Sequence, residues 1–269
     1  MIRPQPVSCR NAEPVTTVVT LPAPTPPSSA TTQQVPPVAP APTVQGQARF
    51  YAFSQGVACS LPDLPLDGYY VGVPTDEYAG SAPCGSYVNI DGPLGSVRAQ
   101  IVDRCPGCPP HQYDLSRTAF AAIANTADGV VPIRITAVHD PSPAPQLYYR
   151  VQQSSSADWL GLLVSGTGNP INQVDLQRPG GTDWLPMRRG YDNYWTLSGA
   201  GAGPFTIRVT DAYGHAALIP GVAITPGQVQ QTGIRLYNDP APVPPTTPAP
   251  PPSPVVVTTV MPAPSDCKD

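Results

Sequence analysis

The chain has 269 residues, of which 40 are proline; 12% are charged and the formal net charge is −4. So few cations form no basic patch to neutralise phosphates, which excludes nucleic acid as an expected partner. No run of about 18 apolar residues occurs, so the sequence predicts no membrane span. We expect a neutral polymer to suit this surface better than a polyanion.

Proline-rich sequence marks both ends of the chain and one break near its middle. Residues 1–45 and 238–269 repeat Pro, Thr, Val and Ala, and repeated proline holds a chain in extended polyproline II without a core. We therefore expect two disordered tails. The break at 140–146 is a short, stiff linker. It separates 46–139 from 147–237, each of about 90 residues and long enough for a small core.

The six cysteines divide between the first folded region and the tails: Cys59, Cys84, Cys105 and Cys108, then Cys9 and Cys267. The 105–108 pair could form half of a zinc site, but a second Cys/His pair at ligand spacing is missing. A redox pair is another alternative, although the βαβ context is absent. We favour structural disulfides, which indicate an exported protein, and we expect no metal or other cofactor. Residues 1–6 lack the apolar core of a signal peptide, so export would use a removed signal or another route.

Short strands and one helix are expected in the first region. The strands cover 48–53, 87–90, 96–102 and 131–138, and an irregular loop covers 54–83. The helix begins after Ser116, whose hydroxyl is a good N-cap. Phe120, Ile123 and Ala124 recur at the spacing of one apolar helix face. Many short strands with a single helix predict a small closed barrel.

Two carboxylates flank the turn that precedes this helix. Asp103 ends an apolar strand and Asp114 comes just before the helix start. A stiff Pro/Gly/Cys turn between them would present both acids in a groove. The alternative is that both side chains cap local backbone N–H groups. His111 in the same turn could assist proton transfer, but a solvated loop histidine is the simpler interpretation.

The second region reads as strands throughout, at 147–151, 159–164, 173–177, 194–197, 205–210 and 216–219. Gly, Pro and Asn separate them at the spacing of a β-sandwich. Its candidate ligand contacts are aromatic, because sugar rings stack on exposed aromatic faces. The candidates are Trp159, Trp184, Tyr191, Tyr194 and Trp195. Core packing is the default for each; it is favoured for Trp184 and for one of Tyr194 and Trp195.

Several motifs carry a resemblance to a known family. The first region contains Gly46-Gln-Ala-Arg-Phe-Tyr, Cys84-Gly-Ser-Tyr-Val-Asn-Ile, Val102-Asp-Arg-Cys-Pro-Gly-Cys and Asp114-Leu-Ser-Arg-Thr-Ala-Phe. In this order they resemble the first domain of expansins, a six-stranded double-psi β-barrel shared with barwin-like proteins, rare lipoprotein A and related endoglucanases. The second region resembles the expansin carbohydrate-binding domain, an immunoglobulin-like β-sandwich, in Tyr149-Arg-Val-Gln-Gln-Ser-Ser-Ser-Ala-Asp-Trp159 and Gly203-Pro-Phe-Thr-Ile-Arg-Val-Thr-Asp-Ala-Tyr-Gly214. The match covers residues 46–237 with both domains in order, and it points to a microbial expansin.

The resemblance assigns roles in the groove of the first domain. It implies that Asp114 is the essential groove acid and that Asp103 supports it. Arg49 and Tyr51 of the first strand are then polysaccharide contacts. Arg49 stands where the family usually has a Thr, and Cys105 stands where many bacterial members have an aromatic residue.

In the second domain the resemblance places Trp159 and Tyr191 on a polysaccharide-binding surface. Asp158 replaces one of two neighbouring surface Trp residues, which should weaken binding to flat cellulose. For the four cysteines of the first domain we predict two disulfides, Cys59–Cys84 and Cys105–Cys108.

Glycoside hydrolysis normally requires a general acid and a second carboxylate. In the related hydrolases the base comes from the first strand, and here residues 49–53 contain no acid. The loop acids could fold over the groove, but solvated loop charges are the simpler interpretation. They are Asp63, Asp67, Asp76 and Glu77.

These observations favour a non-enzymatic function. We expect a secreted, extracellular or wall-associated monomer that binds cell-wall polysaccharide (cellulose, xyloglucan or peptidoglycan) and loosens it without hydrolysis. The alternative is a lytic transglycosylase or weak endoglucanase acting on peptidoglycan or β-glucan, with Asp114 as general acid. A barwin-like protein ligand or inhibitor is a third interpretation, which the second domain disfavours.

Overall fold

The structure is a computed structural model that describes residues 18–20, 42–239 and 256–258. Residues 42–239 belong to one compact unit, and the short strands β1 (Val18–Thr20) and β17 (Val256–Thr258) belong to another. β1 and β17, which lie within the two segments expected to be disordered, pair antiparallel. Both triplets consist of β-branched residues without proline, and such residues favour extended pairing. The other residues of the predicted tails before 42 and after 239, with Cys9 and Cys267, lie outside the described residues.

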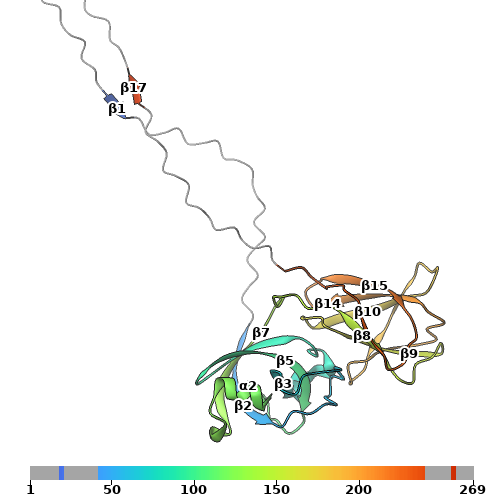
Figure 1. The fold of residues 1–269 in the computed structure, drawn as a ribbon, viewed down its shortest axis with the longest axis horizontal. Helices are drawn as coiled ribbons and strands as arrows, with labels where there is room; N and C mark the ends of the chain where they lie inside the picture. Colours follow the sequence, from blue (N-terminus) through green and yellow to red (C-terminus); the bar gives the residue numbers. More distant parts are fainter. Residues whose placement is uncertain (1–17, 21–41, 240–255, 259–269) are drawn as a thin grey trace, which may run out of the picture. The chain divides into compact units, whose positions relative to one another are not determined.

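Within 42–239, six strands close into a barrel in the order β2-β6-β3-β5-β4-β7. Figure 1 labels four of them, β2, β3, β5 and β7. They are β2 (Thr43–Tyr51), β3 (Tyr70–Pro74), β4 (Tyr87–Gly92), β5 (Gly95–Cys105), β6 (Gln112–Ser116) and β7 (Val131–Ala137). β2 pairs parallel with β6 and β3 with β5, whereas the other neighbours pair antiparallel. Parallel pairs need crossover connections, so the predicted closed barrel is present in a crossed-over form.

Two barrel strands differ from the expectation. β3 lies inside the predicted irregular loop 54–83, and all five of its residues are buried. A strand buried on both faces reads as a continuous apolar run, so a search for alternation misses it. β2 begins at Thr43 rather than Ala48, because residues 43–48 pair with β7.

The predicted helix is present as α2 (Arg117–Ile123). The Ser116 hydroxyl accepts a hydrogen bond from the Ala119 N–H at 3.3 Å, and Phe120 and Ile123 are buried against the barrel. The other helical segments are short: α1 (Thr75–Tyr78), η1 (Ala79–Ser81) and η2 (Thr126–Asp128). Among the described residues, the helices are all too short or too polar to cross a membrane.

The predicted β-sandwich follows, with its two sheets in the orders β11-β10-β14-β15 and β12-β13-β9-β8-β16. Its strands are β8 (Tyr148–Val151), β9 (Trp159–Ser165), β10 (Ile171–Gln177), β11 (Trp184–Pro186), β12 (Arg188–Arg189), β13 (Trp195–Ser198), β14 (Phe205–Asp211), β15 (Ala216–Val222) and β16 (Val229–Gln231). β11, β12 and β16 were not expected, because two or three residues are too few to show a periodic pattern.

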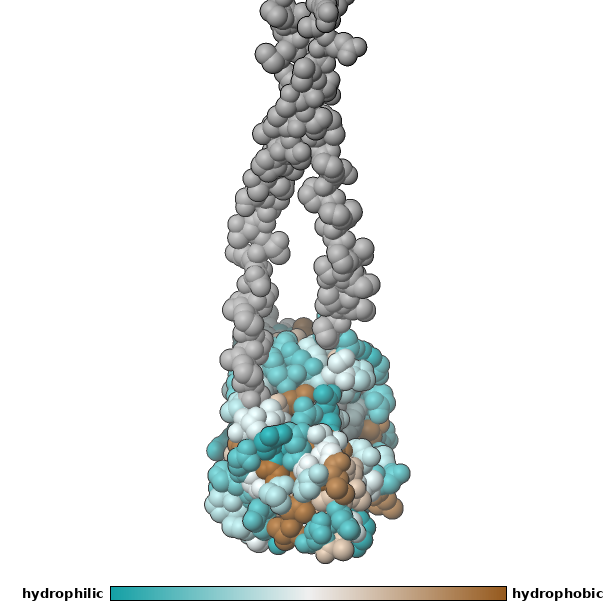
Figure 2. Space-filling model, turned by 90° about the vertical axis from the view of Figure 1, so that its left-hand side faces the viewer, coloured by the Kyte–Doolittle hydropathy of each residue, from teal (hydrophilic) through white to brown (hydrophobic). Residues whose placement is uncertain are grey.

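Each domain has its own hydrophobic core. Val71, Leu115 and Phe120 lie in the barrel core, and Leu162 and Phe205 lie in the sandwich core. The face drawn in Figure 2 is mostly hydrophilic, with small separate hydrophobic areas. Burial of these apolar side chains therefore accounts for both folds.

Candidate functional site: a barrel groove and an aromatic platform

Asp114 lines a groove formed by β2, β3, β5 and β6. In the parallel pairing of β2 with β6, Arg49 is the direct partner of Asp114. The Arg49 guanidinium lies 3.4 Å from the Asp114 carboxylate, and the exposed fractions of the two side chains are 38% and 17%. The sequence thus places an acid and a cation side by side in a partly buried position.

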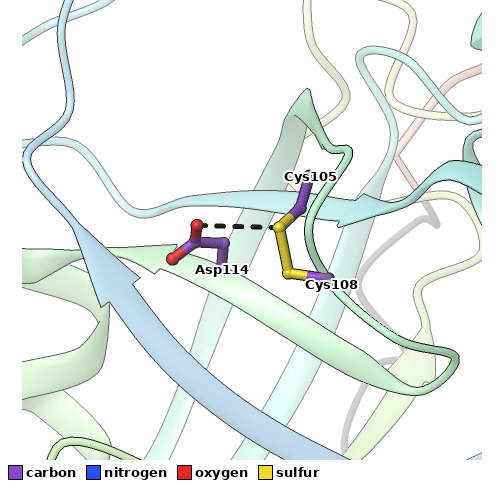
Figure 3. Close-up of side chains that lie close together, drawn as sticks. All are labelled: Cys105, Cys108 and Asp114. Carbon is purple, nitrogen blue, oxygen red and sulfur yellow. Dashed lines mark hydrogen bonds between the residues drawn. A yellow bond between two sulfur atoms is a disulfide. The ribbon is translucent and has the colours of Figure 1, made fainter.

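The predicted Cys105–Cys108 disulfide is present and lies beside Asp114 (Figure 3), and Cys105 lines the groove. Arg49 also donates to the Cys105 Sγ at 3.1 Å, and that sulfur lies 3.8 Å from an Asp114 oxygen. The two sulfurs and the Asp114 carboxylate have the proximity of metal ligands. Because the sulfurs are joined to each other, they are not thiolates and cannot bind zinc as thiolates do.

Burial determines the chemistry of Asp114. It raises the pKa of the carboxyl group, and the negative charge of Asp103 acts in the same direction, while Arg49 opposes both. The Asp114 Oδ1 is buried without a hydrogen-bond partner. A carboxyl group whose pKa is raised by burial holds a proton at a higher pH than an exposed carboxyl group does.

Asp103 makes different hydrogen bonds from Asp114. Its Oδ1 accepts hydrogen bonds from the backbone N–H groups of Ala58 and Arg104, both at 2.9 Å. The capping interpretation therefore describes Asp103 but not Asp114. Asp103 still lines the groove, where its charge acts on the pKa values of Asp114 and Tyr51.

The groove holds about 230 Å³ and is lined by Arg49, Tyr51, Gly72, Asp103, Arg104, Cys105, Pro106, Gly107 and Asp114. The Tyr51 hydroxyl is buried without a partner, and burial followed by the charges of Asp103 and Asp114 raises its pKa. Arg104 was not among the predicted contacts. The sequence signal that could have identified Arg104 is its position directly after Asp103, in a strand that ends at the groove.

The loop acids do not supply a second groove carboxylate: among the described residues, the acids lining this groove are Asp103 and Asp114. Glu77 accepts a hydrogen bond from the Tyr113 hydroxyl at 2.7 Å and lies 3.2 Å from His111. His111 is mostly exposed, as expected for a solvated loop histidine, and neither Glu77 nor His111 lines the groove.

Trp159 lies on the outer face of the five-stranded sheet. Its neighbours Leu160 and Leu162 alternate into the sandwich core, so Trp159 and Gly161 face outward. A Cβ at Gly161 would come within 2.9 Å of the Trp159 ring. The glycine therefore leaves room for the indole to lie over the strand, which explains why Trp159 is half-buried rather than fully exposed.

Tyr191 is the second platform candidate, and its side chain is 52% exposed. It lies between β12 and β13, and the Arg104 guanidinium of the barrel is 5.3 Å from its ring centroid. We refer to Trp159 and Tyr191 as the platform. Asp158, which precedes Trp159 in the sequence, is exposed.

The remaining aromatic residues of the sandwich differ from the expectation in which of them are buried in the core. Trp195 and Tyr194 are both buried, although only one of them was assigned to the core. Trp184, which was also assigned to the core, is half-buried beneath Arg208, whose guanidinium is 4.4 Å from its ring centroid. Its partner in the β10–β11 pairing is Gln177, a half-exposed residue at the end of β10.

A second group of possible metal ligands, Asp140, Asp211 and His215, lies at the linker. The Asn169 amide donates to both carboxylates at 2.7 Å, and His215 lies 2.8 Å from Asp211. These polar atoms already satisfy one another, so the group is a hydrogen-bonded cluster that joins the linker to the sandwich.

Comparisons with known proteins found matches to both domains of the chain. A family profile described as lytic transglycolase matches residues 74–135, and one described as the expansin C-terminal domain matches residues 148–223. A crystal structure of a mutant Clavibacter michiganensis expansin with cellohexaose is 39% identical, with a TM-score of 0.69, and the alignment covers 73% of this chain and 99% of that one. The apo expansin of the same organism is 40% identical with the same coverage. Expansin-YoaJ of Bacillus subtilis is 29% identical over 163 residues, which are 59% of this chain and 69% of that protein.

A double-psi β-barrel with an acid-lined groove, followed by a β-sandwich that matches the expansin C-terminal domain, defines the two-domain class of polysaccharide-loosening proteins. The chain belongs to the expansin family.

Proposed function

We propose that this expansin is an extracellular, wall-associated monomer that binds polysaccharide along the groove and the platform and loosens the polymer network without hydrolysing it. Asp114 shares or donates a proton to a glycan oxygen in the groove, and Arg49 and Tyr51 contact the same chain. Trp159 and Tyr191 hold the polymer by stacking on its C–H faces.

The carrying observation is that, within the part of the chain that the structure describes, the one other carboxylate lining the groove of Asp114 belongs to Asp103. Hydrolysis needs an acid together with a base or nucleophile. The other groove acid, Asp103, holds two backbone N–H groups through one oxygen. The groove thus supplies a proton donor and polar contacts, while its second carboxylate is already engaged with two backbone N–H groups.

Cellulose and peptidoglycan are the candidate polymers. The relative solved with cellohexaose supports a β-glucan ligand. Asp158 beside Trp159 disfavours strong adsorption to flat cellulose, because one platform ring is absent and a charge replaces it. The two disulfides of the barrel support export, because such bonds persist in oxidising compartments.

A lytic transglycosylase remains the second candidate, favoured by the family profile that matches the barrel. Such a reaction needs no attacking water, so one acid can act in both of its steps. Product analysis separates the two functions, because a transglycosylase releases soluble fragments from peptidoglycan.

The test compares the wild-type protein with Asp114→Asn and with Asp128→Asn, a control at an exposed acid in η2. We expect the wild type and Asp128→Asn to weaken a cellulose network without new reducing ends, and to release no muropeptides from peptidoglycan. Asp114→Asn should be folded but inactive in the weakening assay. Sustained release of soluble sugars that is lost in Asp114→Asn would instead establish an enzyme.

A further inference from the structure

We infer that Tyr78, a buried barrel residue, is a positioning residue for the sandwich platform. It holds the turn formed by residues 190–193, so that the Tyr191 ring is presented to the polymer only while the barrel contacts that turn. The inference rests on the proposed platform role of Tyr191. It makes the presentation of the Tyr191 ring depend on the barrel.

The 190–193 turn joins β12 to β13 and is closed by its own backbone. The Asn193 N–H donates to the Gly190 carbonyl at 3.1 Å, and the Gly190 N–H donates to the Tyr194 carbonyl. Asn193 has a φ of +69°, in the left-handed region. These contacts fix the shape of the turn but do not fix its position against the barrel.

Three side-chain hydrogen bonds join this turn to the barrel. The Tyr78 hydroxyl donates to the Tyr191 carbonyl at 2.8 Å, and the Ser81 hydroxyl donates to the Gly190 carbonyl at 2.9 Å. In the opposite direction, the Asn193 amide donates to the Cys59 carbonyl at 3.2 Å. Consecutive parts of one turn are therefore held from three points, which restricts its rotation as well as its distance from the barrel.

Two contacts bear on the Tyr191 ring itself. The Tyr78 ring meets it edge-on, with the centroids 5.1 Å apart and an interplanar angle of 63°. Arg104 lies against it as a cation–π partner at 5.3 Å. Because Arg104 also lines the groove, the platform ring and the groove share a residue. Arg104 therefore connects the groove to the Tyr191 ring.

Tyr78 is in turn held firmly. Its side chain is fully buried. The Tyr78 hydroxyl also lies 3.0 Å from the Ala58 carbonyl and 3.7 Å from the Cys84 sulfur. The Cys59–Cys84 disulfide thus joins the residue whose sulfur contacts Tyr78, Cys84, to the residue whose carbonyl accepts from Asn193, Cys59. A rigid element therefore supports an exposed ring, as a positioning role requires.

The experiment uses full-length protein and measures adsorption to microcrystalline cellulose and to purified peptidoglycan sacculi. Tyr78→Phe removes only the hydroxyl that holds the turn. The matched control is Tyr113→Phe, since Tyr113 is also buried in the barrel and its hydroxyl also donates one strong hydrogen bond, to Glu77. We expect Tyr78→Phe to weaken adsorption about threefold to tenfold, the range of one lost hydrogen bond, and Tyr113→Phe to leave it unchanged.

A double-mutant cycle with Tyr191→Ala separates positioning from general stability. Once the ring is absent there is nothing to present, so adding Tyr78→Phe should have no further effect on adsorption. Ser81→Ala should weaken adsorption in the same way, and it replaces Tyr78→Phe if that variant fails to fold.

The outcomes distinguish the positioning role of Tyr78 from the platform role of Tyr191. If Tyr191→Ala weakens adsorption but Tyr78→Phe and Ser81→Ala do not, the positioning role is wrong and the platform stands. An equal effect of Tyr78→Phe with and without the Tyr191 ring would show a merely structural contribution and would also overturn the inference. If Tyr191→Ala has no effect, the platform assignment fails and the positioning role fails with it.

Discussion

Arg49 and Asp114 face each other across a parallel strand pair, with the guanidinium 3.4 Å from the carboxylate. The pair combines a buried acid whose pKa is raised by its surroundings with a cation that opposes that shift. The balance between them sets the fraction of Asp114 that carries a proton at a given pH.

Arg49→Gln should raise the pKa of Asp114 further. The substitution removes the positive charge that favours the ionised carboxylate, while burial and Asp103 remain. The pH at which Asp114 loses its proton, followed by carboxyl NMR or by the pH profile of wall loosening, should move upward. Arg98→Gln, at an exposed arginine of β5, is the matched control and should leave the profile unchanged.

Asp114→Asn should increase stability at neutral pH. Because the pKa of Asp114 is raised on folding, its contribution is most favourable below the unfolded pKa and is lost as the pH rises through the folded pKa. Asparagine imitates the protonated form and avoids that loss. The melting temperature of the variant should exceed that of the wild type at neutral pH, and the difference should shrink toward acidic pH. A difference that grows on acidification would contradict the assignment.

The four barrel cysteines should be unreactive in unreduced, denatured protein. Thiol labelling followed by peptide mapping should find no label on Cys59, Cys84, Cys105 or Cys108. The Cys59–Cys84 bond closes a loop with a sequence separation of 25. In the chain-entropy account such a loop is worth about 3 kcal/mol, so Cys59→Ser with Cys84→Ser should lower the unfolding free energy by about that amount.

Trp159→Ala should weaken glycan binding by about fivefold, because one stacked aromatic ring contributes about 1 kcal/mol. Trp184→Ala is the matched control, since Trp184 is also half-buried but belongs to the other sheet. Both variants should lose a similar, modest amount of stability, whereas only Trp159→Ala should lose binding in an adsorption isotherm. Equal binding losses would reject the platform assignment.

Asp158→Trp should strengthen adsorption to cellulose. The change supplies a second ring beside Trp159 and removes the carboxylate that flanks it. Asp158→Asn removes the charge without adding a ring and is therefore the control that separates the two effects. If both variants bind equally, charge rather than stacking accounts for the weakness.

The elements that the sequence predicted correctly carry a local signal. The Ser116 hydroxyl caps α2, and the alternation of β7 and β14 appears in their burial. β3 escaped prediction because it is buried on both faces and shows no alternation. Motif resemblance, rather than periodicity, identified the crossed-over form of the barrel.

The candidate site was predictable only in part. Asp114 and Arg49 lie in motifs, and their pairing follows from the parallel register of β2 and β6. The contact between Tyr78 and Tyr191 joins residues 113 positions apart, and no local pattern encodes it. The divided roles of Asp103 and Asp114 depend on which backbone N–H groups lie within reach, and only the folded geometry decides this.

The position of β2 in the barrel has a consequence for folding. The strand comes first in the domain, yet it pairs with β6 and with the last barrel strand, β7; the Thr43 and Thr136 hydroxyls meet across a separation of 93 residues. Contacts between such distant segments require closure of a long loop before any of them forms, and this slows folding. During synthesis or export, β2 therefore cannot complete its pairing until β7 is available. A chain that lacks β7 has an unpaired strand edge at β2. The barrel is expected to fold slowly and in one cooperative step, in which the last strand completes the groove.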